Sequence, residues 1–83
     1  MALDRAAVIE RMHAIAVEIA ERPLPALTES QIIAELGLDS LSTLEMVGTL
    51  EREMSIRLPT DELGDIHTVG ELVDLIDSKL AAK

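Results

Sequence analysis

The 83-residue sequence contains no cysteine and no phenylalanine, tyrosine or tryptophan. The absence of cysteine excludes disulfides and thiolate metal sites, and it fits a reducing compartment. Without aromatic residues, the core has to be built from aliphatic side chains and the four methionines. Hydrophobic residues still make up 48% of the chain, which is enough for a small helical core. We therefore expect a single domain over residues 1–83.

Basic residues are scarce: seven Lys and Arg against 16 Asp and Glu give a formal net charge of −9. Nucleic acids and anionic membranes both require a cationic surface, so we expect neither as a partner. A basic protein surface is the natural complement. No stretch approaches the length of a membrane span, and charged residues interrupt the apolar positions near the N-terminus. We expect a monomer in the cytoplasm.

Apolar residues recur at three- and four-residue spacing in three segments, which predicts three main helices. The first helix is expected from residue 3 to about residue 20, ending before Pro23. The second follows Asp39 or Ser40, either of which can cap it, and closes before Pro59. Its expected apolar stripe consists of Leu41, Leu44, Val47, Leu50 and Met54.

The third main helix begins at Thr68, where Glu71 completes the pattern of a capping box. Before it, Thr60 is expected to cap one further helical turn, which Gly64 stops. No segment has a strand pattern. The predicted fold class is therefore all-α: a small helical bundle with three main helices, one short helix and a long first loop.

The long first loop covers residues 21–38 and carries apolar residues of its own. A long loop with such anchors is usually ordered and often functional. Residues 28–31 can start a short helical turn within it. The residues expected to pack on the helices are Leu24, Leu27, Ile32, Ile33, Leu36 and Leu38.

The loop leads into Leu36-Gly37-Leu38-Asp39-Ser40-Leu41, which presents a serine at the start of a helix. A nucleophilic serine needs a base within hydrogen-bond reach, and that base needs an orienting partner. The two histidines, His13 and His67, lie far away in the sequence and in no catalytic context, and His13 is expected on a helix surface. Ser40 is therefore interpreted as a group that another enzyme modifies. We expect no catalytic residue and no metal site.

Residues 36–41 resemble the attachment motif of acyl carrier proteins, in which the serine carries 4′-phosphopantetheine. Residues 66–73, Ile-His-Thr-Val-Gly-Glu-Leu-Val, resemble the family's entry into its last helix. The resemblance implies an acyl carrier domain without catalysis of its own. It implies that a phosphopantetheinyl transferase attaches the arm to Ser40 and that the arm's thiol holds an acyl group as a thioester. The positive end of a helix dipole also favours a phosphodiester at this position.

The resemblance further implies recognition by acyl-transferring and synthase enzymes with basic docking surfaces. The residues expected to meet the transferase or these enzymes are Asp39, Leu41, Leu44, Glu45, Gly48, Glu51, Glu62 and Asp65. The residues expected to line a core that can admit part of an acyl chain are Val47, Leu50, Met54, Ile66 and Val73.

Three positions depart from the pattern of the fatty-acid members of this family: Gly48, Arg52 and Met54. They favour a carrier for a specialised polyketide-type pathway over one for general fatty-acid synthesis. A peptidyl or aminoacyl carrier is the nearest alternative, although Gly37-Leu38-Asp39-Ser40 leans towards acyl carriers. A non-covalent helical protein-interaction module, with Ser40 only as a helix cap, is a second alternative. A serine hydrolase that uses either histidine is a third.

Overall fold

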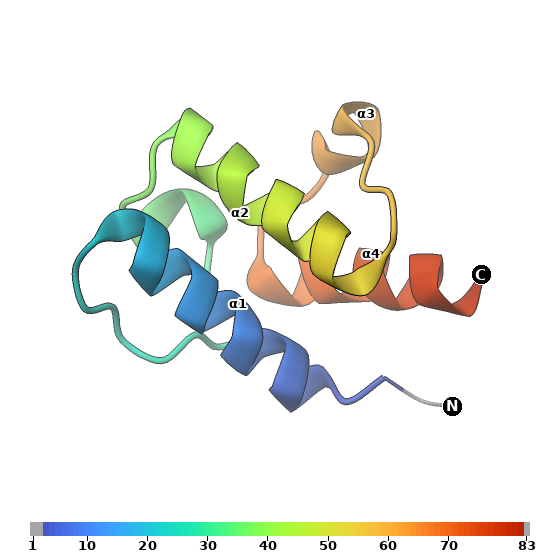
Figure 1. Cartoon of the computed structure of the whole chain (residues 1–83), viewed down its shortest axis with the longest axis horizontal. Helices are drawn as coiled ribbons and strands as arrows, with labels where there is room; N and C mark the ends of the chain where they lie inside the picture. Colours follow the sequence, from blue (N-terminus) through green and yellow to red (C-terminus); the bar gives the residue numbers. More distant parts are fainter. Residues whose placement is uncertain (1–2, 83) are drawn as a thin grey trace.

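The computed structural model describes residues 3–82, so residues 1, 2 and 83 of the predicted domain lie outside it. The elements follow the order α1 (Arg5–Ala20), the 3-10 helix η1 (Ile33–Leu36), α2 (Ser40–Met54), α3 (Thr60–Leu63) and α4 (Val69–Ala81). α1 packs against both α2 and α4, and the long first loop wraps the end of the bundle (Figure 1). The predicted all-α bundle of three main helices and one short one is confirmed.

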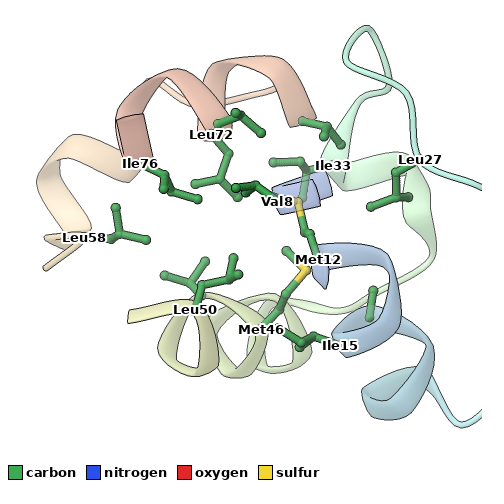
Figure 2. Packing of buried hydrophobic residues seen from close by; sticks show 14 of the residues in the cluster. Val8, Met12, Ile15, Leu27, Ile33, Met46, Leu50, Leu58, Leu72 and Ile76 are labelled. Atoms are coloured by element: carbon green, nitrogen blue, oxygen red, sulfur yellow. The ribbon is translucent and has the colours of Figure 1, made fainter. Parts of the chain in front are cut away.

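The core lies where α1, α2 and α4 meet. Met12, Met46 and Leu50 have no exposed surface, and Leu72 and Ile76 are buried to the same degree. Figure 2 shows these side chains directed into the space between the helices, with Met12 from α1 and Met46 from α2. Methionine is unbranched and flexible, so it fills irregular gaps that an aromatic ring would otherwise fill.

The buried face of α2 is rotated from the stripe predicted for it. Met46, Val47 and Leu50 are buried, as the spacing requires. Leu41 and Leu44, which belong both to the predicted apolar stripe and to the residues predicted for recognition, are 66% and 54% exposed. Successive helical residues turn by about 100°, so Leu41 and Leu44 point to a different side of α2 from Met46 and Leu50. Spacing alone could not separate the two sets.

The long first loop is ordered by its own apolar residues, as predicted. Leu27, Ile33 and Leu36 are buried in the core. Ile32, which we expected to pack, is 41% exposed. The helical turn forms at η1 instead of residues 28–31, which make a turn closed by the bond from the Gln31 N–H to the Thr28 carbonyl, 3.2 Å.

A backbone ladder ties this loop to the start of α4. An isolated antiparallel bridge pairs Ile32 with Thr68, which turns the Ile32 side chain out of the core. We refer to these contacts as the loop–α4 ladder. Two hydrogen bonds of 2.9 Å make the bridge, from the Ile33 N–H to the His67 carbonyl and from the Val69 N–H to the Gln31 carbonyl. A third, also 2.9 Å, runs from the Gly70 N–H to the Glu29 carbonyl.

An arginine at the start of α1 reinforces the ladder. α1 begins at Arg5, two residues later than the pattern predicted, because Asp4 caps it by accepting from the backbone N–H of the third residue on, 3.1 Å. The Arg5 guanidinium donates to Glu29, 2.6 Å, to Asp74, 2.8 Å, and to the Gly70 carbonyl, 3.3 Å. The hydrogen bond from Arg5 lowers the pKa of the Glu29 carboxyl. One side chain thus joins α1, the loop and α4.

The predicted start of α4 is confirmed, whereas that of α3 is not. The Thr68 hydroxyl accepts from the Glu71 N–H, 3.1 Å, and the Glu71 carboxylate accepts from the Thr68 N–H, 2.9 Å, which completes the capping box. Thr60 is the first helical residue of α3 and not its cap. The capping position belongs to Pro59, which supplies no side-chain hydrogen bond, and Gly64 follows the last residue as expected.

Two glycines provide opposite tests of this fold. Gly37 has φ of 84°, a left-handed conformation that a side chain strains, whereas Gly48 lies inside α2 with room for a methyl group. We expect Gly37→Ala to lower the free energy of unfolding by roughly 1–2 kcal/mol. We expect Gly48→Ala to raise it by up to about 1 kcal/mol, because alanine is the better helix former. Urea denaturation of both variants measures this, and a destabilised Gly48→Ala would show that the glycine is needed within the fold.

Candidate functional site

Ser40 is the first residue of α2 and is exposed. Asp39, not Ser40, caps the helix, because its carboxylate accepts from the Ser42 N–H at 2.7 Å. The Asp39 carbonyl also accepts from the Thr43 hydroxyl, 2.9 Å. The hydrogen bond from the Ser42 N–H, with the Ser42 side chain second, lowers the pKa of the Asp39 carboxyl. With capping assigned to Asp39, the Ser40 hydroxyl makes no hydrogen bond within residues 3–82.

Neither histidine forms a hydrogen bond with this hydroxyl. His13 is half-buried and its Nε2 lies 2.8 Å from the Leu24 carbonyl, so it ties the first loop to α1 instead of lying free on the surface as expected. His67 is exposed, and its backbone belongs to the loop–α4 ladder. Across residues 3–82, histidine and acidic side chains form no group that could hold a metal ion.

Arg22 holds the segment that leads to Ser40. Its Nη2 donates to the carbonyls of Leu36 and Gly37, both at 3.3 Å. The guanidinium lies so close to Gly37 that a Cβ there would be 2.3 Å from Nη2. Sequence reasoning missed this role, because Arg22 was considered only as part of the end of α1. Nothing in its spacing to Gly37 indicates the contact.

A small apolar cavity lies next to the start of α2, between α2, α3 and α4. Its volume is about 110 Å³, several times the share of one water molecule in the liquid, about 30 Å³. Leu50, Met54 and Val73 were expected in such a space but do not line it. Leu50 and Val73 are completely buried, because other core side chains surround them. The lining residues are Ile33, Thr43, Leu44, Met46, Val47, Leu63, Ile66 and Leu72, which include the predicted Val47 and Ile66.

The acidic residues predicted for docking divide into two groups. Glu45 and Asp65 are exposed and have no ionic partner in the part of the chain that the structure describes. Glu51 instead accepts from the Leu58 N–H, 2.8 Å, and so holds the loop after α2. Glu62 pairs with Lys79, 2.7 Å, across α3 and α4. The latter two carboxylates therefore have structural partners that the sequence did not indicate.

The outward face of α2 carries the remaining predicted residues. Leu41 and Leu44 are exposed beside Ser40, and Glu45 follows on the same side of the helix. At Gly48, a Cβ would meet only the Arg52 guanidinium, at 3.6 Å. This surface is thus apolar next to Ser40, and at Gly48, one turn after Leu44, no side chain projects from it.

Comparison with known proteins identifies the family. The family model described as a phosphopantetheine attachment site matches residues 10–76. An acyl carrier protein of Phenylobacterium zucineum is 37% identical over 76 residues, which cover 90% of this chain and 96% of that protein. The crystal structure of an acyl carrier protein from Thermotoga maritima superposes with a TM-score of 0.86 at 29% identity, covering 96% of this chain and 94% of that one. The 3,5-dioxohexyl acyl carrier protein of the actinorhodin polyketide synthase from Streptomyces coelicolor gives 0.73 at 27% identity, covering 99% and 95%.

The chain belongs to the phosphopantetheine-binding acyl carrier proteins. Members of this family are carriers and not enzymes, and their prosthetic group is covalently attached 4′-phosphopantetheine. When bound, this group supplies a thiol that holds an acyl group as a thioester. The site fits it, because the start of α2 offers an exposed hydroxyl and the positive end of the helix dipole favours a phosphate there. Within residues 3–82, no helix has the length and apolar character needed to cross a membrane.

The cap at Asp39 can be tested apart from Ser40. Asp39→Ala removes the acceptor, and we expect the melting temperature at neutral pH to fall by a few degrees, on the order of 5 °C. Asp39→Asn keeps an oxygen acceptor, so its melting temperature should fall much less. Thermal unfolding followed by circular dichroism measures both.

The same variants have a defined pH dependence. The pKa of Asp39 is lowered in the folded state, so its ionised form stabilises the fold above the unfolded pKa, about 3.9. This stabilisation is lost as the pH falls through the lower folded pKa. The difference in melting temperature between wild type and Asp39→Ala should therefore become smaller on acidification below about pH 4. A difference that becomes larger there would contradict the assignment of the cap.

Proposed function

We propose that Ser40 carries the 4′-phosphopantetheine and that the protein delivers acyl groups to partner enzymes. The observation that carries this assignment is the Ser40 hydroxyl itself, which is exposed, makes no hydrogen bond with the described residues and lies at the first turn of α2. A separate phosphopantetheinyl transferase would join it to the arm. In that step, Ser40 Oγ forms a P–O bond, the pyrophosphate bond of coenzyme A breaks and adenosine 3′,5′-bisphosphate leaves, while the hydroxyl proton passes to the transferase or solvent.

We propose that the docking surface for partners begins at Asp39 and follows the outward face of α2. Leu41 and Leu44 supply exposed apolar area beside the attachment point, Glu45 supplies free negative charge, and Gly48 permits close approach. Asp65 extends the acidic surface. Glu51 and Glu62 contribute less to it, because the first binds the Leu58 N–H and the second pairs with Lys79. Exposed charges speed encounter with a basic partner without making the complex long-lived, which suits a carrier that visits several enzymes.

For the pathway, we propose a specialised polyketide-type synthesis. Gly48, Arg52 and Met54 support this, since each departs from the pattern of fatty-acid carriers, and the fold is also similar to that of the actinorhodin carrier. We further propose that the protein works as a monomer, because two copies with a net charge of −9 repel each other.

The proposed attachment of phosphopantetheine to Ser40 is tested by measuring the mass of the intact protein. Incubation of the purified protein with coenzyme A and a broad-specificity phosphopantetheinyl transferase should add the mass of one phosphopantetheine. Ser40→Ala should add none, because the only proposed acceptor oxygen is gone. Ser30→Ala removes another exposed serine and serves as the matched control, which should be modified like wild type. An unmodified wild-type protein, or modification that persists in Ser40→Ala, would reject the proposal.

The acidic part of the docking surface is tested by charge reversal. We expect Glu45→Lys to lower kcat/KM for loading by the transferase by about tenfold at low salt. The loss should shrink in high salt, where exposed charges are screened within about 3 Å at 1 M. Glu10→Lys changes the same charge at an exposed position on α1 and should have little effect. Equal losses in the two variants would show that net charge, and not this face, determines loading.

A further inference from the structure

Two arginines stand apart from the other cations that the structure describes. Arg5, Arg11 and Lys79 each bind carboxylates, and Arg22 binds two backbone carbonyls. Arg52 donates only to the hydroxyl of Thr49 in its own helix, 3.3 Å. Arg57 has no hydrogen-bond or ionic partner among residues 3–82. Both guanidiniums are exposed, so in a chain with surplus carboxylates they remain without one.

The loop after α2 holds Arg57 outward. Its neighbours Ile56 and Leu58 are 9% and 3% exposed and anchor the loop in the core. Glu51 binds the same two residues: its carbonyl accepts from the Ile56 N–H, 3.1 Å, and its carboxylate from the Leu58 N–H, 2.8 Å. With both neighbours fixed, the backbone at Arg57 has little freedom. The exposed cation is therefore presented from a rigid loop.

Two shallow depressions flank Arg57. One, of about 430 Å³, is lined by Ser55, Ile56, Arg57 and Lys79. The other, of about 360 Å³, is lined by Glu51, Arg52, Ile56, Arg57 and Pro59. Lys79 of the first depression pairs with Glu62, so that pair carries no net charge. Glu51 of the second depression holds the Leu58 N–H and keeps its negative charge, which is smaller than the charge of the two arginines together. The net charge of the residues lining these depressions is thus positive. We call Arg52 and Arg57 the cationic end.

Arg52 lies on the same face of α2 as the proposed docking surface, and Arg57 lines the same depression as Arg52. Leu41, Glu45, Gly48 and Arg52 follow one another at four-, three- and four-residue steps, which places them on one stripe of α2. Arg52 is 12 residues beyond Ser40, or about 18 Å along the helix at a rise of 1.5 Å per residue. The stripe therefore changes sign along its length, with free negative charge near Ser40 and free positive charge at the far end.

We propose that the outward face of α2 is a two-signed docking surface. A partner enzyme that acts on the group at Ser40 would place basic side chains opposite Glu45 and acidic side chains opposite the cationic end. Opposite charges at the two ends determine the direction of docking, because a partner rotated by half a turn would meet like charges. This proposal rests on the proposed carrier function.

A discrete acidic patch on a protein fits the cationic end better than a polyanion does. A membrane or nucleic acid would approach the whole chain, whose net charge of −9 repels it. A folded partner can bring two or three carboxylates to Arg52 and Arg57 and keep the rest of its acidic surface away. Arg52 also complements the negative end of the α2 dipole, but this role does not extend to Arg57, which lies outside the helix.

The test uses the holo-protein and those acyl-transferring enzymes whose turnover falls in Glu45→Lys, since they dock on this face. We expect Arg52→Gln/Arg57→Gln to lower kcat/KM about tenfold at low salt, through KM, and Arg57→Gln alone to lower it less. Arg11→Gln, which removes one exposed cation of α1, is the control and should stay near wild type. Exchanging a facing carboxylate of the enzyme for lysine should restore turnover of Arg57→Glu.

The outcomes that overturn the proposal are separate from failure of the carrier function. Intact mass reports loading of Ser40 in every variant, so a loaded protein without a docking defect rejects only the two-signed surface. The proposal is therefore rejected if the loaded Arg52→Gln/Arg57→Gln variant keeps kcat/KM within twofold of wild type with every such enzyme. Because Arg57 has no partner within the described chain, Arg57→Gln should fold normally even if the double variant does not. Binding of the wild type, but not the double variant, to phosphatidylglycerol vesicles would also reject a protein partner.

Discussion

The loop–α4 ladder is the constraint on which the rest of the structure depends. It fastens a long connection to the start of the last helix through three backbone hydrogen bonds, and Arg5 ties the same place to α1. Ordering a loop of this length carries a large entropic cost, which buried Leu27, Ile33 and Leu36 help to offset. With the loop held at this point, the chain reaches Gly37 and Ser40 from one direction. The position of Ser40 therefore depends on contacts made far from it.

α2 has one buried face and one exposed face. Its inner face supplies Met46 and Leu50, which are completely buried, whereas Leu41 and Leu44 are 66% and 54% exposed. Leu44 also lines the small cavity next to the start of α2, so it contributes to packing as well as to the surface. Leu41 is the more exposed of the two and contributes least to the core. The surface beside Ser40 is therefore apolar without being needed in full for the fold, which is why we propose it for docking.

Charge is used in two distinct ways. Arg5, Arg11 and Lys79 connect elements that are distant in sequence, and the hydrogen bond from Arg11 lowers the pKa of the Glu53 carboxyl as that from Arg5 does for Glu29. These pairs are exposed, so each contributes little, and their value lies in fixing which elements adjoin. Among residues 3–82, Arg52 and Arg57 have no carboxylate in hydrogen-bond contact. These two arginines, one in the last turn of α2 and one in the loop after it, are the basis of the two-signed surface that we propose.

The sequence by itself determined the local features: three amphipathic helices, the capping box at Thr68 and Glu71, and a serine presented at a helix start in a motif that resembles acyl carriers. These depend on residues a few positions apart, so their spacing is visible in the chain. Only the tertiary structure decided that Leu41 and Leu44 face outward, that Ile32 leaves the core, that Arg22 lies on Gly37 and that Glu51 holds the loop after α2. Each of these depends on the direction in which distant elements pack. A hydrophobic period reports that a face is apolar, but not which neighbour, if any, will cover it.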